Sequence, residues 1–217
     1  MENNTDKKYI LEVKNLSKYF PIATNFFGKP TCYLKAVNNV SFSLEKGKTI
    51  GVVGESGCGK TTLGRTILKL YEPNEGQIIF DGHDITKISK NEMRKYRTSM
   101  QLIFQDPYSS LPPRITVGSI ISEAVIYHNI VPKEQVNEYV RYIMKKCGLQ
   151  PQYYDRYPHE FSGGQRQRIC IARALAVNPK LVICDEPVSA LDVSIQAQII
   201  NLLKELQLKL GLTYVFI

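Results

Sequence analysis

The sequence predicts an α/β fold with a mainly parallel sheet, and two features of the chain support this prediction. Short apolar segments rich in β-branched residues alternate with longer segments whose apolar residues recur at helical spacing. Strands that alternate with helices form parallel sheets whose faces are covered by those helices. The length of 217 residues allows one large domain, or one domain that carries an insertion.

The expected strands are recognised by apolar residues and by the turn residues that follow them. Residues 9–20 and 36–44 are predicted as strands, and residues 21–33, which contain two prolines and a glycine, as a loop. Further strands are expected at residues 49–53, 77–80, 99–105, 181–184 and 212–217.

The expected helices are recognised by apolar periodicity and by capping residues. One helix is predicted near residues 61–70, a second begins near Ser162, and a third spans residues 195–210, with Ser194 before it and Gly211 after it. A further helix ends at Gly148, which suits a C-terminal cap. It belongs to a predicted helical insertion over about residues 107–162.

Composition narrows the class of protein. Charged residues make up 22% and hydrophobic residues 43%, as in ordinary globular domains, and no apolar run approaches the roughly 20 residues of a membrane helix. The five cysteines are scattered and form no C-x-x-C pair, which argues against a zinc site or a disulfide framework. The net charge of +8 is compatible with nucleic acid, nucleotide phosphates or an anionic surface, and does not decide among them.

The segment "GESGCGKT" matches the phosphate-binding pattern G-x-x-x-x-G-K-[ST] and lies between a predicted strand and a predicted helix. Its glycines allow the backbone to turn tightly, so that N–H groups at the helix start point towards phosphate. Lys60 is expected to reach the β- and γ-phosphates, and the Thr61 hydroxyl to bind Mg²⁺. The predicted ATP-binding residues are Gly54, Glu55, Ser56, Gly57, Cys58, Gly59, Lys60, Thr61 and Thr62.

Two carboxylates follow the apolar segment "LVIC" and are candidates for catalysis. Asp185 at the strand end can hold Mg²⁺, and Glu186 can act as the base that polarises the attacking water. A "DE" pair alone is more often a solvated turn. The presence of a phosphate loop in the same chain favours the catalytic interpretation.

The segment "FSGGQRQR" contains a second glycine-rich helix start. Ser162, Gly163, Gly164 and Gln165 closely match the signature L-S-G-G-Q of the ATP-binding-cassette (ABC) ATPases, with Phe161 in place of leucine. A second anion cradle is needed when two chains face each other head to tail, because each then clamps the other's ATP.

With these motifs, nearly the whole chain resembles the ABC ATPase family. The resemblance implies a role for Gln105 in "LIFQDP" in sensing Mg²⁺ and the attacking water, and it places Asp192 of "SALD" along the seam between two ATPases. Phe20 is in the register of the aromatic residue that stacks on adenine, with Tyr19 and Tyr33 as alternatives.

The resemblance also implies an architecture. The fold class is an α/β P-loop NTPase of the ABC ATPase type, with a mainly parallel core sheet, an N-terminal antiparallel β subdomain and an inserted α-helical subdomain. Residues 1–217 are expected to form a single nucleotide-binding domain, with the helical subdomain at about residues 107–162.

Longer segments, among them "LIFQDPYSSL" and "DEPVSALDVSIQAQIINLL", are similar to the ATPases of dipeptide, oligopeptide and nickel importers, in particular to the second of their two ATPase subunits. The resemblance implies ATP hydrolysis that powers uptake of peptides, or of nickel, at the cytoplasmic face of the membrane. The expected partners are transmembrane permease subunits, a second, non-identical ATPase and, indirectly, an extracytoplasmic substrate-binding protein. The sequence "SSLPPR" departs from the subfamily, which usually has Asn before the second proline.

The end of the chain carries a separate expectation. In the family, the strand equivalent to "LTYVFI" is followed by Ser-His-Asp, whose histidine contacts the γ-phosphate, and none of His83, His128 and His159 is at that position. We therefore expect a cassette that is incomplete at its C-terminus, binds Mg-ATP and hydrolyses it poorly.

Two other functions compete with import. A soluble ABC ATPase that acts on nucleic acid or the ribosome would use the basic charge, but such proteins carry long coiled coils, zinc modules or a second cassette, and this chain shows none of these patterns. A small-molecule P-loop kinase conflicts with the signature sequence. We expect no nucleic acid partner.

Overall fold

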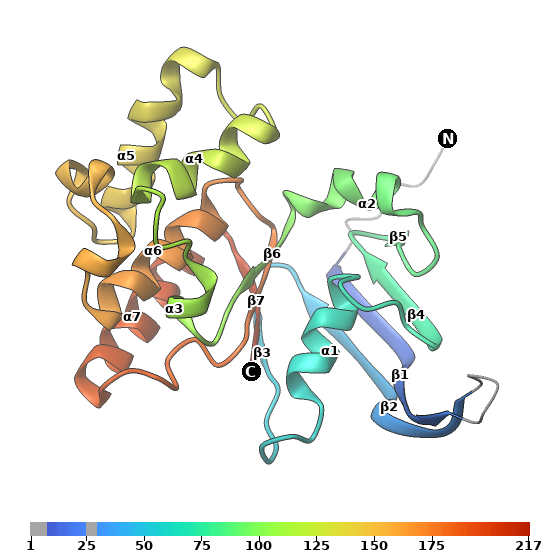
Figure 1. Cartoon of the computed structure of the whole chain (residues 1–217). Coiled ribbons are helices and arrows are strands. Elements are labelled where there is room, and N and C mark those ends of the chain that lie inside the picture. The colour runs from blue at the N-terminus through green and yellow to red at the C-terminus, as the bar shows by residue number, and fades with distance from the viewer. Residues whose placement is uncertain (1–7, 25–29) are drawn as a thin grey trace, which may run out of the picture. The chain divides into compact units, whose positions relative to one another are not determined.

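The computed structural model describes residues 8–24 and 30–217, and the chain divides into two compact units (Figure 1). The first unit comprises Met1–Tyr96 together with Thr213–Ile217, and the second comprises Arg97–Leu212. The phosphate-loop segment belongs to the first unit. The signature segment and both candidate carboxylates belong to the second.

The first unit contains an antiparallel sheet with the strand order β2-β1-β4-β5. Its apolar core includes Leu11, Leu16, Ile78 and Phe80, each at most 2% exposed. The elements of this unit are β1 (Tyr9–Thr24), β2 (Pro30–Glu45), β3 (Thr49–Gly51), α1 (Lys60–Ile67), β4 (Glu75–Phe80), β5 (His83–Asp84), α2 (Lys90–Arg97, whose last residue belongs to the second unit) and β8 (Thr213–Phe216).

The predicted loop at residues 21–33 is wrong over most of its length, because β1 continues to Thr24 and β2 begins at Pro30. Residues 25–29 of that loop lie outside the described residues. Pro21 lacks a backbone N–H, yet it pairs with Tyr33 of β2 beyond Ser17, where the pairing of β1 with β4 ends. At this point β1 is an edge strand, and edge strands tolerate proline.

A separate parallel pair leads into the phosphate loop. Thr49 of β3 pairs with Tyr214 of β8, and the N–H of Val52 donates to the carbonyl of Phe216 at 2.8 Å. Tyr214 and Val215 are 3% and 1% exposed, as expected for the apolar segment at residues 212–217. The segment that follows β3 is therefore anchored at its start by β8.

Helices dominate the second unit, and they pack with a second parallel pair, β6 and β7. The apolar core of this unit includes Ile121, Val140, Ile169 and Ile171, which are fully buried. The elements are β6 (Met100–Ile103), α3 (Pro107–Ser110), α4 (Val117–Tyr127), η1 (Lys133–Gln135), α5 (Val136–Lys146), η2 (Pro151–Asp155), η3 (Pro158–Glu160), α6 (Gly163–Leu175), β7 (Leu181–Cys184) and α7 (Val193–Leu210).

Helix ends in the second unit follow capping rules. After α5, Gly148 has φ +73°, its N–H donates to the carbonyl of Lys145, and the N–H of Leu149 donates to that of Met144, which together form a Schellman motif. Helix α7 begins at Val193 with Asp192 at the N-cap, so the prediction that Ser194 precedes the helix is wrong. The segment after β6, residues 107–160, contains the helical elements α3 to η3 and no strand. The domain boundaries predicted from the sequence stay a prediction.

Among the described residues, every helix is too short or too polar to span a bilayer.

We predict that burial of α6 determines much of the stability of the second unit. Ile171→Ala removes a fully buried side chain and should lower the free energy of unfolding by about 2–5 kcal/mol. Ile126→Ala, in α4 and 48% exposed, is the matched control and should cost less than half as much. Urea unfolding measures both, and equal losses would contradict the assigned burial.

Candidate functional site

The phosphate loop connects β3 to α1 and turns sharply at Gly59. Gly59 has φ +98°, and a Cβ atom there would lie 1.9 Å from the carbonyl oxygen of Ala36. Only glycine fits this combination of left-handed backbone and close approach. The site therefore requires glycine at the residue directly before α1.

Lys60 folds back over the loop that precedes it. Its Nζ donates to the carbonyl oxygens of Gly54 at 2.9 Å and Glu55 at 2.7 Å. In the described structure no side chain caps the start of α1, where Gly59 occupies the N-cap. A helix start that lacks a side-chain cap, next to an ammonium group, favours an anionic ligand.

The remaining predicted residues of the loop line the same segment. Gly57 has φ +80°, Cys58 carries an exposed free thiol, and the N–H of Cys58 donates to the carbonyl of Glu55 at 3.3 Å. Ser56 lies in the exposed part of the loop, and Thr61 and Thr62 form the first turn of α1. The structure thus gathers the nine predicted residues into one loop and one helix start.

The aromatic candidates for adenine stacking differ in their surroundings. Phe20 and Tyr71 form a T-shaped pair with ring centroids 5.4 Å apart, and the Lys18 ammonium lies 5.1 Å from the centre of the Phe20 ring. Tyr19 donates its hydroxyl to Glu75, whereas Tyr33 is 49% exposed. All three belong to the first unit, and the choice of Phe20 stays a prediction.

Gln105 and Glu186 meet in the second unit. The amide Nε2 of Gln105 donates to Oε2 of Glu186 at 2.7 Å. Asp185 is 2% exposed, and its N–H donates to the carbonyl of Ile103 at 2.9 Å. Three of the residues predicted to act on Mg²⁺ and water are therefore held at the ends of two neighbouring strands.

The backbone at Glu186 is left-handed, with φ +45°, which is a rare conformation for a residue with a long side chain. Ser189 supports it, because its N–H and its hydroxyl both donate to the Glu186 carbonyl, at 3.2 and 3.1 Å. Such backbone conformations cluster at functional sites.

The signature segment forms the start of α6. Ser162 and Gln165 make a capping box, in which the N–H of Ser162 donates to the Gln165 side chain at 3.0 Å and the Ser162 hydroxyl accepts from the Gln165 N–H at 3.4 Å. A Cβ atom on Gly164 would lie 2.5 Å from Cγ2 of Ile195, and one on Gly163 would lie 3.4 Å from Leu191. Gly164 thus also permits the close approach of α6 and α7.

Asp192 occupies the N-cap of α7, and in the described structure its exposed side chain makes no capping hydrogen bond. Aspartate at this position usually accepts from the next turn. Its carboxylate is left available for another contact.

Comparison with known proteins assigns these motifs to a family. The model of the ABC transporter family matches residues 37–189. The oligopeptide transport ATP-binding protein AppF of Bacillus subtilis is 55% identical over 98% of this chain, and OppF of Haemophilus influenzae is 52% identical over 100% of it.

The chain belongs to the ABC transporter family.

Solved structures agree with this assignment. CbiO1 of Clostridium perfringens, described as part of an ABC transporter complex, aligns with a TM-score of 0.80 at 29% identity, over 97% of this chain and 78% of that one. The ATP-binding cassette MJ0796, in a dimer bound to ADP and Pi, aligns with a TM-score of 0.80 at 28% identity, over 95% of this chain and 86% of that one. The predicted ABC ATPase fold is confirmed.

The chain spans part of the length of its ABC relatives. It covers 65% of AppF, 66% of OppF and 33% of the glutathione import ATP-binding protein GsiA of Pectobacterium atrosepticum, which is 52% identical over 96% of this chain.

The sequence did not indicate a contact between the signature helix and α3. The Arg166 guanidinium lies 4.0 Å from the ring centre of Tyr108, and its Nε donates to the carbonyl of Pro158 at 2.8 Å. Tyr108 lies two residues after Asp106, whose carboxylate caps α3. The backbone N–H of Tyr108 holds the pKa of that carboxyl below its usual range. No sequence pattern pairs Arg166 with Tyr108. The signal that the sequence does offer is the position of Arg166 directly after the signature, which marks this arginine as a residue to inspect.

We predict that the two signature glycines differ in their effect on stability. Gly164→Ala should lower the free energy of unfolding by about 1–3 kcal/mol, because its methyl group meets Ile195 at α7. Gly163→Ala, in the same helical turn, is the control and should be neutral or slightly stabilising.

A double substitution tests the cause. Adding Ile195→Ala to Gly164→Ala removes the opposing Cγ2 atom and should recover part of the loss beyond the effect of Ile195→Ala alone. Strictly additive losses in urea unfolding would show that the two helices do not collide there.

Proposed function

We propose that this chain is the ATP-binding and ATP-hydrolysing subunit of an importer for di- and oligopeptides. The observation that carries the proposal is the conformation of the phosphate loop, in which Lys60 closes over the segment before the uncapped start of α1. The family and the printed functions of AppF and OppF support the same conclusion.

The loop residues fit the phosphates of ATP. Gly59 lets the chain enter α1 without a side chain that would block the helix start. The backbone N–H groups there attract phosphate oxygens, and Lys60 exchanges its carbonyl partners for the β- and γ-phosphates. Phe20 stacks on the adenine ring in this proposal.

The donor set also suits Mg²⁺, which supplies charge neutralisation on the phosphates when it is bound. A hydroxyl from Thr61, an amide oxygen from Gln105 and a carboxylate from Asp185 are hard oxygen donors. Within the described ranges, no three His, Cys, Asp or Glu side chains gather into a metal site. Few protein ligands are expected for a Mg²⁺ ion that is also held by phosphate and water.

Hydrolysis follows from the residues at the ends of β6 and β7. Glu186 accepts a proton from the attacking water, and Gln105, which is hydrogen-bonded to Glu186, orients that water. Ser162, Gly163, Gly164, Gln165 and Asp192 act on the ATP held by the opposing ATPase. Two ATPases facing each other give each signature segment a ligand.

The importer assignment defines the partners. We propose transmembrane permease subunits, a second, non-identical ATPase and, indirectly, an extracytoplasmic substrate-binding protein. The chain then acts peripherally at the cytoplasmic face of the membrane. Peptide is favoured over nickel because AppF and OppF are named as oligopeptide transport proteins.

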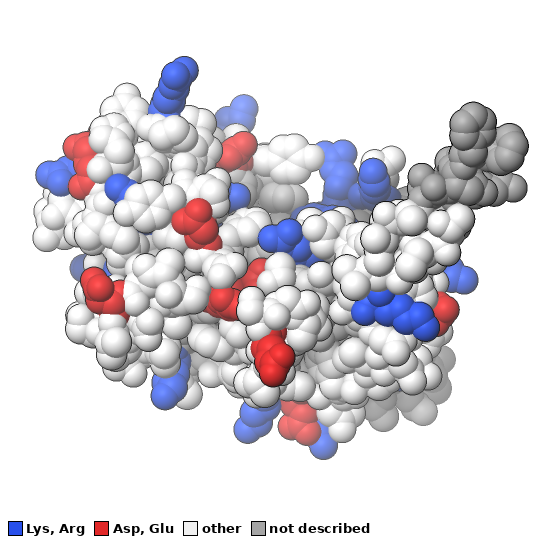
Figure 2. Space-filling model, turned by 60° about the horizontal axis from the view of Figure 1, so that its bottom comes forward, with Lys and Arg blue, Asp and Glu red and all other residues white. Residues whose placement is uncertain are grey.

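The alternative of a nucleic-acid or ribosome-directed ATPase relies on the net charge of +8. Figure 2 shows one face of the protein, on which the described lysines and arginines are interspersed with acidic and uncharged residues rather than aligned in a stripe. Proteins that follow a phosphate backbone gather their cations along one face or one helix. The charge distribution on this face therefore gives the alternative no support.

We predict that Lys60→Ala weakens ATP binding at least about tenfold, because a charge-assisted contact to phosphate is lost. Binding of a fluorescent ATP analogue with Mg²⁺ measures the effect. Lys90→Ala, at an exposed lysine that begins α2, is the matched control and should bind as the parent does. Equal affinity of parent and Lys60→Ala would refute the role of the loop.

We predict that Glu186→Gln abolishes at least about 99% of steady-state phosphate release, while ATP affinity stays within about threefold. Glutamine keeps an oxygen that accepts from Gln105 but cannot accept the proton of water. Turnover unchanged by Glu186→Gln would rule out this residue as the base. A parent chain that binds ATP through Lys60 with little turnover would match the poor hydrolysis expected from the sequence and would leave the ATP-binding half of the proposal intact.

A further inference from the structure

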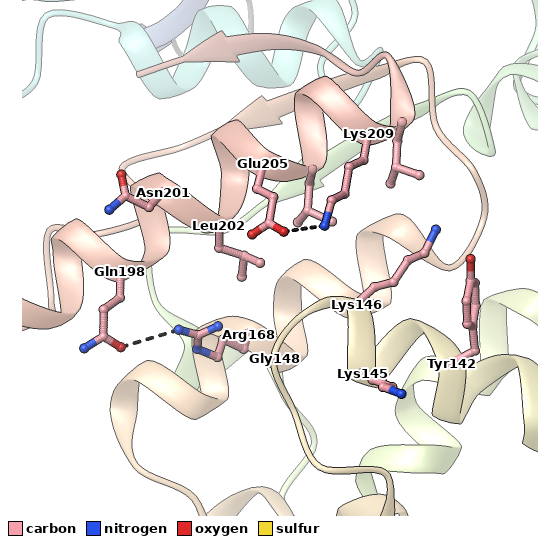
Figure 3. A pocket seen from close by; sticks show the side chains of 12 residues that line it. Tyr142, Lys145, Lys146, Gly148, Arg168, Gln198, Asn201, Leu202, Glu205 and Lys209 are labelled. Carbon is pink, nitrogen blue, oxygen red and sulfur yellow. Dashed lines mark hydrogen bonds and ion pairs between the residues drawn. The ribbon is translucent and has the colours of Figure 1, made fainter.

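A pocket of about 680 Å³ lies within the second unit, and none of its lining residues is one that we assign to the nucleotide site. Its walls are the last turn of α5, Arg168 of α6 and one face of α7 (Figure 3). The volume falls in the range of about 300–1,000 Å³ that is usual for small-molecule sites.

The leucines of α7 form the apolar floor of the pocket. Leu202 and Leu206 line the pocket and are 7% and 2% exposed, and Leu210, at the end of the helix, is 40% exposed. The lining leucines run from Leu202 to Leu210, which corresponds to about 12 Å along a helix axis. This floor is long enough for an extended apolar chain.

The rim of the pocket is basic. Lys145, Lys146, Arg168 and Lys209 line it, and Glu205 is the acidic residue among the lining side chains. Glu205 already forms an ion pair with Lys209 on the same helix, as Figure 3 shows. Lys146 lies 4.6 Å from the ring centre of Tyr142, so a cation and an aromatic ring stand together on the α5 wall.

The walls are tied together by Arg168. Its Nη1 donates to the carbonyl of Cys147 at 3.0 Å, and its Nη2 donates to the side chain of Gln198 at 3.4 Å. The first bond caps the C-terminus of α5. The second bond reaches α7, as Figure 3 shows. The φ of +73° at Gly148 favours glycine, and a Cβ atom there would lie 2.5 Å from Nη1, so that the guanidinium would have to shift. The pocket is therefore preformed.

We propose that this pocket binds an anionic amphiphile, a small carboxylate with an extended apolar body. The apolar body lies on the leucines of α7, and the carboxylate meets the ammonium group of Lys146, while Lys145 adds positive charge to the same rim. A small anion without an apolar body is a poor fit, because the C-terminus of α5 at this site carries the negative end of a helix dipole. The concave shape favours a free ligand over a flat membrane surface. The inference does not depend on ATP binding.

The chain offers a clean reporter for this site, because it contains no tryptophan. Tyr142 is 51% exposed at the rim, and Tyr142→Trp places a single indole beside Lys146, where it keeps the cation–aromatic contact. Sodium decanoate, added below its micelle-forming concentration, should cause a saturable blue shift of the tryptophan emission. Sodium acetate and 1-decanol, which carry the charge or the apolar body alone, should cause at most a weak response.

Matched variants locate the binding. In the Tyr142→Trp background, Lys145→Gln with Lys146→Gln should raise the decanoate midpoint at least about fivefold. Lys204→Gln, at an exposed lysine of α7 that does not line the pocket, should leave it within about twofold. A separate variant, Tyr127→Trp in the otherwise unaltered chain, places the single tryptophan at an exposed position in α4 and should show no saturable shift of its emission.

A smaller cavity of about 280 Å³ also borders Tyr142, and its charged lining residue is Glu138. Decanoate in that cavity would not respond to Lys145 and Lys146, so the double variant separates the two sites. Stabilisation of the unaltered chain by decanoate in thermal unfolding, and its loss in the double lysine variant, repeats the test without tryptophan.

Several outcomes would overturn the proposal. An equal response to decanol and decanoate would reduce the pocket to an apolar surface, and a midpoint unchanged in the double variant would remove the lysines from binding. Displacement of decanoate by phosphatidylglycerol vesicles, together with membrane association of the chain that needs the same lysines, would assign the basic rim to lipid headgroups instead.

Discussion

The parallel pairing of β6 with β7 is the constraint on which the candidate hydrolytic residues depend. Ile103 pairs with Cys184 at the last position of both strands, and the N–H of Asp185 donates to the Ile103 carbonyl. Gln105 and Glu186 each lie two residues beyond this pair, so equal offsets bring their side chains to 2.7 Å. A shift of one residue in register would make the two offsets unequal and would disrupt the contact between the two side chains.

Much of this arrangement could be predicted because the signals are local. A short apolar strand followed by carboxylates predicts the end of β7, and serine with glutamine three residues later predicts the capping box that begins α6. Gly148 and Gly211 were correctly expected at helix ends, where both take positive φ. In each case the residue type itself determines the backbone conformation, so neighbouring residues suffice.

The features that could not be predicted depend on residues distant in sequence. The extension of β1 through Pro21 requires the pairing with β4 to end earlier, which the proline itself does not reveal. The second role of Gly164 depends on Ile195. Gln167 lies on the buried face of α6 with no hydrogen-bond partner for its amide among the described residues, although its polarity predicts exposure.

The two proposed sites would bind an anion in contrasting ways. At the phosphate loop the proposed ligand meets a helix N-terminus, so backbone N–H groups are expected to supply much of the attraction, and Gly59 at the N-cap leaves that helix start without a side-chain cap. At the basic pocket the ligand meets the C-terminus of α5, whose dipole opposes an anion, so side-chain ammonium groups and an apolar floor must provide the attraction. Binding at the pocket should therefore weaken with added salt at the exposed lysines, whereas the apolar contribution from Leu202 and Leu206 persists. This difference in physical origin makes the two sites independently addressable by mutation.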